Sequence, residues 1–202
     1  MSHTETFLQE AAQVIARLDR RPIDHMVELL VQTRDQGGRL FILGVGGSAG
    51  NASHAVNDFR KLAGIETYAP TDNVSELTAR TNDEGWETVF AAWLAGSRLN
   101  PRDLVMVFSV GGGDRERNIS ANLVAALEYA KKAGARICGI VGRDGGFTAK
   151  VADACLIVPT ISPHSITTLA ESFQVLIWHL LVSHPAVQTQ PMKWETTAPS
   201  QV

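Results

Sequence analysis

The sequence predicts an α/β fold in which helices cover both faces of a five-stranded parallel sheet. Five short apolar runs, each bounded by turn residues, alternate with longer segments whose apolar residues recur at helical spacing. Most of these runs are apolar throughout rather than at every second residue, as is typical of parallel strands buried on both faces. No internal repeat, low-complexity tract or linker interrupts the pattern, so we expect a single domain over residues 1–202.

Two helices come first. Apolar side chains recur every three or four residues over 4–18, and again over 23–36, where Gly37-Gly38 ends the pattern in the way that glycine commonly ends helices. Residues 4–36 are therefore expected to form N-terminal helices that precede the α/β core.

The core is expected over residues 39–160. The five apolar runs that predict its strands are 39–45, 65–69, 104–110, 136–141 and 154–159. The intervening segments that predict helices are 49–63, 73–80, 86–99, 119–133 and 147–151. A C-terminal helix rich in Leu, Val, Ile and Trp is expected over 165–184. The polar tail over 185–202 is expected on the surface or across a neighbouring subunit.

The composition excludes several classes of function. Apolar residues make up 45% and charged residues 19% of the chain, and the net charge of -3 argues against a nucleic-acid or acidic-membrane partner. The N-terminus does not resemble a signal peptide, and we expect no membrane span and a cytoplasmic protein. Cys138 and Cys155 lie in apolar runs and are expected to be buried thiols rather than a disulfide or a metal pair.

A glycine-rich loop follows the first expected strand and reads Gly44-Val45-Gly46-Gly47-Ser48-Ala49-Gly50-Asn51. Such a loop lets the backbone approach an anion at the positive end of the next helix. Three interpretations stay open: a dinucleotide site with Glu66 as the ribose contact, a monophosphate site, or a turn that binds nothing. No lysine of the Walker type follows, which disfavours a nucleoside triphosphatase.

A second loop of small residues follows the third expected strand, over 109–120. Ser109, Ser120 and backbone N–H groups are suited to holding phosphate oxygens, and Arg115 or Arg117 either adds charge or is merely exposed to solvent. A dinucleotide fold does not require this second loop. Two cooperating loops at the carboxyl ends of strands favour one sugar phosphate instead.

These motifs resemble a known family. The pattern GxGGSAxxAxH over 44–54, together with the serine- and glycine-rich loop after the third strand, resembles the sugar isomerase (SIS) domain, and within it the phosphoheptose isomerases. The resemblance spans about residues 6–184. It implies a flavodoxin-like sheet and the interconversion of sedoheptulose 7-phosphate and D-glycero-D-manno-heptose 7-phosphate. It also implies a homotetramer whose active sites draw residues from neighbouring subunits.

Aldose–ketose isomerisation needs a base, an acid and a group that stabilises the enediolate oxygen. His54 and Asp58 are four residues apart and share one face of a helix, with Asn57 nearby. Glu171 and His179 are eight apart on the last expected helix. Two imidazoles and two carboxylates make a ligand set for Zn²⁺. Taken singly, each histidine is more commonly a surface or core residue.

The resemblance assigns roles to these positions and also shows departures. In the family, all four matching residues bind zinc, a glutamate at position 58 is the base, and the histidine at position 179 is the acid. The family has glutamine at position 171. Asp58 is one methylene shorter than that glutamate, a difference of about one ångström that matters for proton transfer. Glu171 adds a negative charge to the site.

The expected substrate-binding residues come from both loops, from the segment TARTNDEGW and from the last helix. They are Val45, Gly46, Gly47, Ser48, Asn82, Asp83, Ser109, Val110, Gly111, Ser120 and Glu171. Val45 stands where the family has asparagine, Val110 and Gly111 stand where it has threonine and serine, and the second loop is longer by about six residues. These departures leave the identity of the sugar open.

The sequence thus predicts a zinc-dependent sugar-phosphate isomerase. In this hypothesis Ser48, Ser109, Ser120 and the loop amides bind the phosphate. Asp58 is the base, His179 the acid, and zinc polarises the carbonyl group. Three alternatives remain: a non-catalytic SIS regulatory or adaptor protein, an SIS isomerase for a pentose or hexose phosphate, and a small dinucleotide-binding protein.

Overall fold

The fold is built on one all-parallel sheet. The computed structural model describes residues 2–192 of the chain and orders the strands β2-β1-β3-β4-β5. The strands are β1 (Arg39–Leu43), β2 (Glu66–Tyr68), β3 (Leu104–Ser109), β4 (Arg136–Val141) and β5 (Ala154–Ile157). This order confirms the flavodoxin-like prediction. After β2 the chain crosses back over β1 and forms β3 on the other side of it. β1 and β3 therefore pair directly, and the loops that follow these two strands are neighbours at one edge of the sheet.

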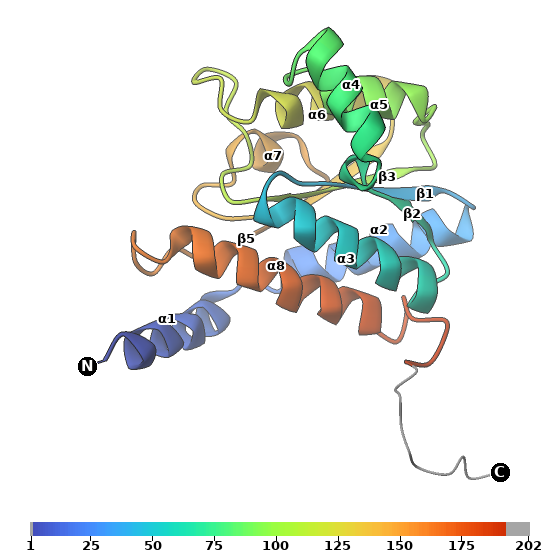
Figure 1. The fold of residues 1–202 in the computed structure, drawn as a ribbon. Helices are drawn as coiled ribbons and strands as arrows, with labels where there is room; N and C mark the ends of the chain where they lie inside the picture. The colour runs from blue at the N-terminus through green and yellow to red at the C-terminus, as the bar shows by residue number, and fades with distance from the viewer. Residues whose placement is uncertain (1, 193–202) are drawn as a thin grey trace, which may run out of the picture.

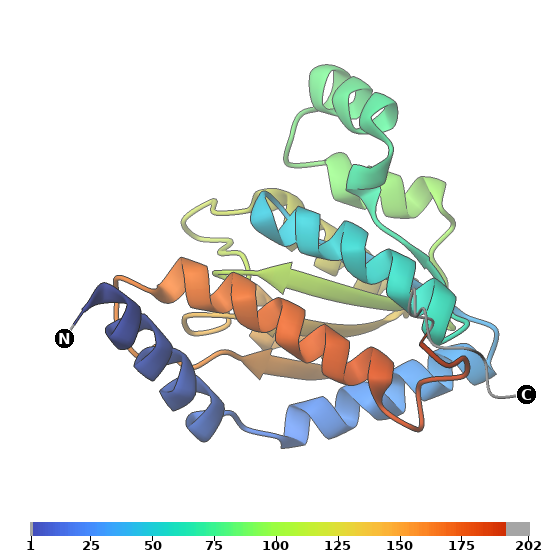
Figure 2. The ribbon, with the colours of Figure 1, turned by 60° about the horizontal axis from the view of Figure 1, so that its bottom comes forward.

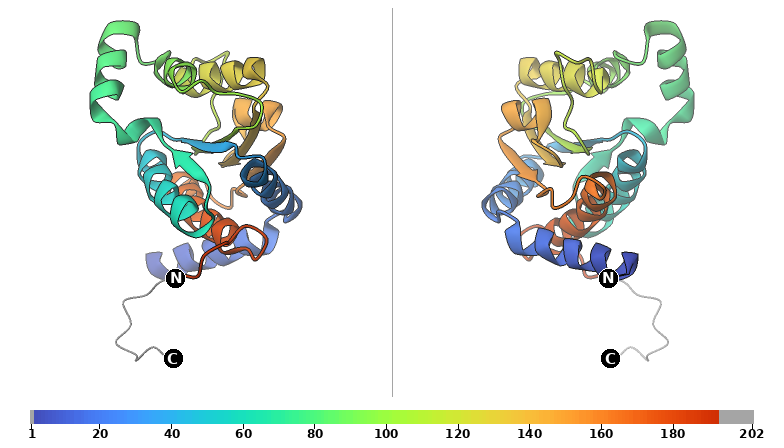
Figure 3. Two further views of the ribbon diagram at one scale, coloured as in Figure 1. Left: turned by 90° about the vertical axis from the view of Figure 1, so that its right-hand side faces the viewer. Right: turned by 90° about the vertical axis from the view of Figure 1, so that its left-hand side faces the viewer.

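Helices cover both faces of the sheet (Figure 1; Figure 3). On one face lie α2 (Arg21–Asp35), α3 (Gly47–Leu62) and α8 (Ile166–Ser183), and on the other α5 (Val89–Gly96), α6 (Ala121–Ala133) and α7 (Gly146–Val151). Because strand side chains alternate between faces, Leu40 and Ile42 of β1 belong to the first core, while Phe41 and Leu43 belong to the second.

Two helices extend from this body (Figure 2). In α1 (His3–Arg17), Ser2 and Glu5 form a capping box, and Val14 is the one buried residue. The helix α4 (Val74–Glu84) has no buried residue and follows the short 3₁₀ helix η1 (Pro70–Asp72). Both helices therefore expose most of their side chains.

The elements confirm the prediction in number and order, with differences at their ends. The strand β4 has the expected bounds, whereas β1, β2, β3 and β5 are shorter than predicted. The helix expected from residue 119 begins only at Ala121, because Ile119 pairs with Asp114 in an isolated bridge and Ser120 has a left-handed backbone with φ of 50°. The helix expected over 73–80 continues to Glu84.

The helix α8 is the one helix among residues 2–192 that is long and apolar enough to cross a membrane, with a mean hydropathy of 1.3 over 18 residues. Length and composition alone do not make this helix a membrane span. The helix instead packs within the core, where Phe173, Ile177 and Leu181 are buried. A buried helix of a folded domain passes the same test.

The first part of the expected tail lies against α3. The backbone N–H groups of Thr189 and Gln190 donate to the carbonyl oxygen of Leu62, and Val187 is fully buried. The rest of the tail, residues 193–202, lies outside the described residues. Both cysteines are free thiols. Cys138 is buried as predicted, whereas Cys155 is only partly buried, and its burial raises the pKa of the thiol to about 11.

Candidate functional site

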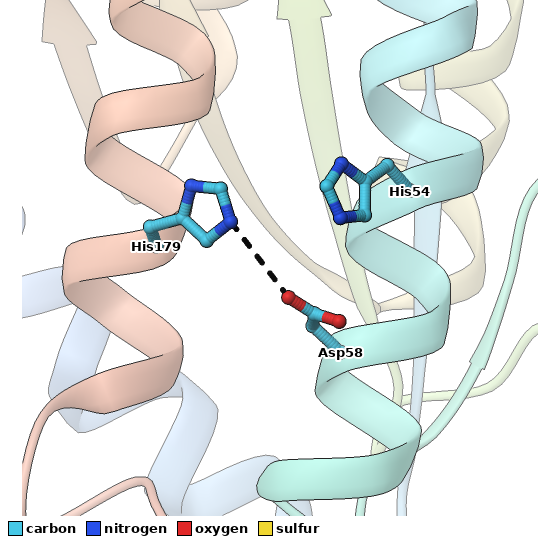
Figure 4. Close-up of side chains that lie close together, drawn as sticks. All are labelled: His54, Asp58 and His179. Atoms are coloured by element: carbon cyan, nitrogen blue, oxygen red, sulfur yellow. Dashed lines mark ion pairs between the residues drawn. The ribbon is translucent and has the colours of Figure 1, made fainter. Parts of the chain in front are cut away.

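Three of the four predicted metal ligands come together where α3 packs on α8. His54 and Asp58 lie one turn apart on α3, and His179 faces them from α8 (Figure 4). One ligand atom from each residue lies within 4.8 Å of the other two. The Nε2 atom of His179 is 3.8 Å from Oδ2 of Asp58. This distance is too long for a direct hydrogen bond and leaves room for a shared ligand.

The carboxylate of Asp58 is oriented by its neighbour in the sequence. The side-chain amide of Asn57 donates to Oδ1 of Asp58 over 2.8 Å, which leaves Oδ2 facing His179. The side chain of Asp58 is 16% exposed and that of His179 is 43% exposed. The cluster is thus reachable from solvent.

Glu171 lies outside this cluster. Its carboxyl group rests against Gly47 at the start of α3, so closely that a Cβ atom at position 47 would be 2.7 Å from the carboxyl carbon and from each oxygen. Glycine is therefore required there as long as Glu171 keeps this position. The eight-residue spacing on α8 places Glu171 more than two turns from His179, beside the first loop.

The first loop turns directly into α3. Gly46 has φ of 62° and ψ of -127°, a conformation that side-chain-bearing residues rarely adopt, and α3 begins at the next residue. Ser48 is buried, and its hydroxyl oxygen accepts a hydrogen bond from the side chain of Gln174 over 3.0 Å. The predicted phosphate ligand Ser48 thus faces α8, while Val45 beside it is 38% exposed.

A short chain of hydrogen bonds connects this loop to α8. The amide of Asn51 donates to the backbone oxygen of Glu171 over 3.0 Å and to Oε1 of Gln174 over 2.9 Å. Gln174 is fully buried and continues the chain to Ser48. Sequence reasoning missed Asn51 and Gln174. The available signal was a glutamine on the apolar side of the last helix, where an unpaired polar group is costly.

The second loop is held against the start of α7. The hydroxyl oxygen of Ser109 accepts from the N–H of Gly112 over 3.0 Å, and the carbonyl oxygen of Gly112 accepts from both the hydroxyl and the N–H of Thr148. Val110 and Gly111, which lie between Ser109 and Gly112, are half-buried. Ser120, at the far end of the loop, makes no side-chain hydrogen bond that caps α6. Ser109 and Ser120 thus stand at the two ends of the loop.

The two arginines of this loop have partners on the surface. Arg115 forms an ion pair with Glu128 at 2.9 Å, and Arg117 lies 3.7 Å from Asp114. Both arginine side chains are largely exposed. Their arrangement agrees with the solvent-exposed interpretation.

Asn82 and Asp83 lie on α4, which stands apart from the two loops (Figure 2). Both side chains are exposed, and the amide of Asn82 donates to Oδ1 of Asp83 over 2.7 Å. Within the described residues of one chain, the structure does not bring this pair to the His54, Asp58 and His179 cluster.

Comparison with known proteins adds independent evidence. Residues 6–142 match the SIS domain family. The chain is 35% identical to the lincomycin biosynthesis protein LmbN of Streptomyces lincolnensis over 91% of this chain and 69% of that protein. It is 32% identical to a phosphoheptose isomerase of Syntrophotalea carbinolica, over 77% and 80% respectively.

A solved structure has the same fold. The phosphoheptose isomerase of Neisseria gonorrhoeae superposes with a TM-score of 0.78 at 24% identity, covering 89% of this chain and 95% of that one. At this level of identity the likeness concerns the fold. It places the same sheet and the same flanking helices in both molecules.

Proposed function

Because this chain belongs to the SIS domain family and is of the phosphoheptose isomerase type, we propose that it is an aldose–ketose isomerase acting on a sugar phosphate. The observation that carries this proposal is the convergence of His54, Asp58 and His179 across two helices. A base, an acid and a metal ligand set are the groups that the reaction needs. The substrate that fits the relatives is sedoheptulose 7-phosphate, with D-glycero-D-manno-heptose 7-phosphate as the product.

The donor set suits a divalent cation, and we assign it to Zn²⁺. Two imidazoles and one carboxylate within 4.8 Å of one another are a typical catalytic zinc set, in which a further position stays open for water or substrate. A bound zinc ion would polarise the substrate carbonyl group. The role of Glu171 as a fourth ligand requires its carboxyl group to leave Gly47, and it remains a prediction.

The residues of the cluster then divide the proton transfers between them. Asp58 removes the proton from one of the two adjacent carbons and returns it to the other, while His179 exchanges a proton with the substrate oxygen. The 3.8 Å between Oδ2 of Asp58 and Nε2 of His179 allows both groups to reach neighbouring substrate atoms. Asn57 keeps the carboxylate turned toward His179.

The phosphate is assigned chiefly to the second loop, with Ser109, Ser120 and the amides around Val110 and Gly111. The first loop supplies the amides of Gly46 and Gly47, and Ser48 contributes its hydroxyl hydrogen. Since Ser48 accepts from Gln174, that hydrogen remains available for an anion.

We further propose that the chain is one cytoplasmic SIS domain and works as a homotetramer. Exposed apolar side chains on α1 and α8 support assembly, and the position of Asn82 and Asp83 on the outlying α4 suits a contribution to a neighbouring subunit's site. No nucleic-acid or membrane partner is proposed.

The proposal is tested by conversion of sedoheptulose 7-phosphate, with pentose and hexose phosphates alongside, followed by NMR with and without Zn²⁺. We expect Asp58→Asn and His179→Ala each to lower kcat by about 10²- to 10⁴-fold, because each removes a proton-transfer group. His25→Ala, which removes an exposed histidine on α2, is the matched control and should retain full activity.

Equal rates for wild type and both site variants would overturn these catalytic assignments. Tight binding of the sugar phosphates without conversion would instead favour a non-catalytic regulatory or adaptor protein.

A further inference from the structure

One buried indole ring contacts both histidines of the cluster. Trp178 is fully buried on α8. Its ring centroid lies 3.6 Å from that of His179, with 35° between the ring planes, and 4.8 Å from that of His54, with 73° between the planes. The two imidazoles themselves are 5.6 Å apart and nearly perpendicular. Trp178 thus forms the inner wall on which a ring from α3 and a ring from α8 both rest.

The imidazoles have few other contacts that could orient them. His54 is exposed and the side chain of His179 is 43% exposed. Within residues 2–192, neither ring makes a hydrogen bond, and Nε2 of His179 lies 3.8 Å from Oδ2 of Asp58. Metal-binding histidines usually gain their orientation from a hydrogen bond to the second ring nitrogen. Here packing against Trp178 orients the two rings in place of such a hydrogen bond.

The polar edge of the indole has no part in this arrangement. The buried Nε1 atom of Trp178 has no hydrogen-bond partner among the described residues. A buried N–H without an acceptor is unfavourable, and a phenylalanine would avoid it. The size and shape of the indole, rather than its N–H, therefore explain how one residue reaches both histidines.

We propose that Trp178 is a positioning residue, which holds the rings of His54 and His179 at the angle that their shared ligand requires. The inference rests on the proposed function only for the identity of that ligand. Removing the indole ring frees both imidazoles to adopt other rotamers while Asp58 stays in place.

The first measurement uses histidine-labelled protein and needs neither metal nor substrate. We expect the ring protons of His54 and His179 to show contacts with the indole of Trp178 by NMR, together with shifts from its ring current. In Trp178→Leu these shifts are lost. Leu181→Ala, which removes a fully buried side chain from the same helix, is the matched control for lost packing and should leave both histidine signals in place.

The second measurement is the affinity for Zn²⁺. We expect Trp178→Leu to bind Zn²⁺ about 10- to 100-fold more weakly than wild type, the usual effect of losing the support behind a metal ligand. Leu181→Ala should keep the wild-type affinity. Trp178→Phe, which restores an aromatic face of smaller size, should recover part of the loss.

The outcomes separate the two proposals. Absence of contacts between the indole and the two imidazoles in wild type overturns the positioning role, whether or not any variant folds. Unchanged imidazole rotamers and unchanged Zn²⁺ affinity in Trp178→Leu overturn it as well. If wild type binds no Zn²⁺ but the imidazole rings of His54 and His179 change rotamer in Trp178→Leu, as measured by NMR contacts with their other neighbours, the positioning role stands and the zinc assignment fails.

Discussion

Glu171 departs from the family by its negative charge, and the structure shows what surrounds its carboxyl group. The carboxyl group of Glu171 lies against Gly47, beside the first N–H groups of α3. A carboxylate there occupies the favourable electrostatic environment that a helix start otherwise offers to a bound anion. Glu171 therefore opposes the binding of a phosphate ester at the first loop and shifts that role toward the second loop.

Glu171→Gln tests this effect. We expect the KM for a sugar phosphate to fall roughly fivefold, because two like charges about 4 Å apart repel by about 1 kcal/mol in a watery environment. The affinity for Zn²⁺ should stay unchanged if Glu171 is not a ligand. Titration with Zn²⁺, run alongside the steady-state kinetics, shows whether Glu171 is a metal ligand. Weaker Zn²⁺ binding by the variant would show that the carboxylate does reach the metal.

At the scale of elements, the pairing of α3 with α8 creates the candidate site. Apolar residues such as Phe59 and Ile177 bury the two helices in the same core. The hydrogen bonds from Asn51 through Gln174 to Ser48 fix how one helix lies on the other. Because His54 and Asp58 come from one helix and His179 from the other, this polar connection also sets their separation.

Gln174→Leu removes the middle of that connection. We expect the free energy of unfolding to fall by about 1–3 kcal/mol, because Asn51 and the buried Ser48 lose a partner while the side-chain volume is nearly kept. Chemical denaturation measures the change. Gln9→Leu, at an exposed position of α1, is the control and should differ little from wild type. Equal stability of Gln174→Leu and wild type would show that packing alone aligns the two helices.

For the molecule as a whole, the exposed apolar side chains of two helices are the features that support the proposed assembly. On α1, Leu8 is 63% and Ile15 56% exposed, and on α8, Leu176 is 48% and Leu180 42% exposed. Side chains of this size gain free energy when another protein surface covers them. The proposed homotetramer would cover them with further copies of the chain.

Light scattering tests this assembly against the chain mass of 21.8 kDa. We expect the wild type to have four times this mass and Leu176→Glu to dissociate, because a charge at a buried contact is poorly tolerated. Gln32→Glu adds the same charge at an exposed polar position of α2, outside the two helices proposed for assembly, and should assemble normally. A monomeric wild type at working concentration would contradict the homotetramer.

The elements that sequence reasoning placed best are those with the strongest local pattern. The run over 136–141 has the same bounds as β4, because its residues after the exposed Arg136 are all buried and apolar, as is typical of a strand covered on both faces. The start of α6 was misplaced, since the backbone of Ser120 and the pairing of Ile119 with Asp114 depend on the shape of the whole loop.

The sequence by itself determined the α/β pattern, the two loops at the ends of β1 and β3, and the shared helix face of His54 and Asp58. These features follow from continuous apolar runs, from the 3.6-residue period of helices and from clusters of glycine and serine, which are all local properties of the chain. Only the tertiary structure decided that His179 meets that pair, that Trp178 backs both histidines, and that Glu171 lies on Gly47 instead. Such contacts depend on how helices cross and which rotamers fit, and no spacing along the chain encodes either.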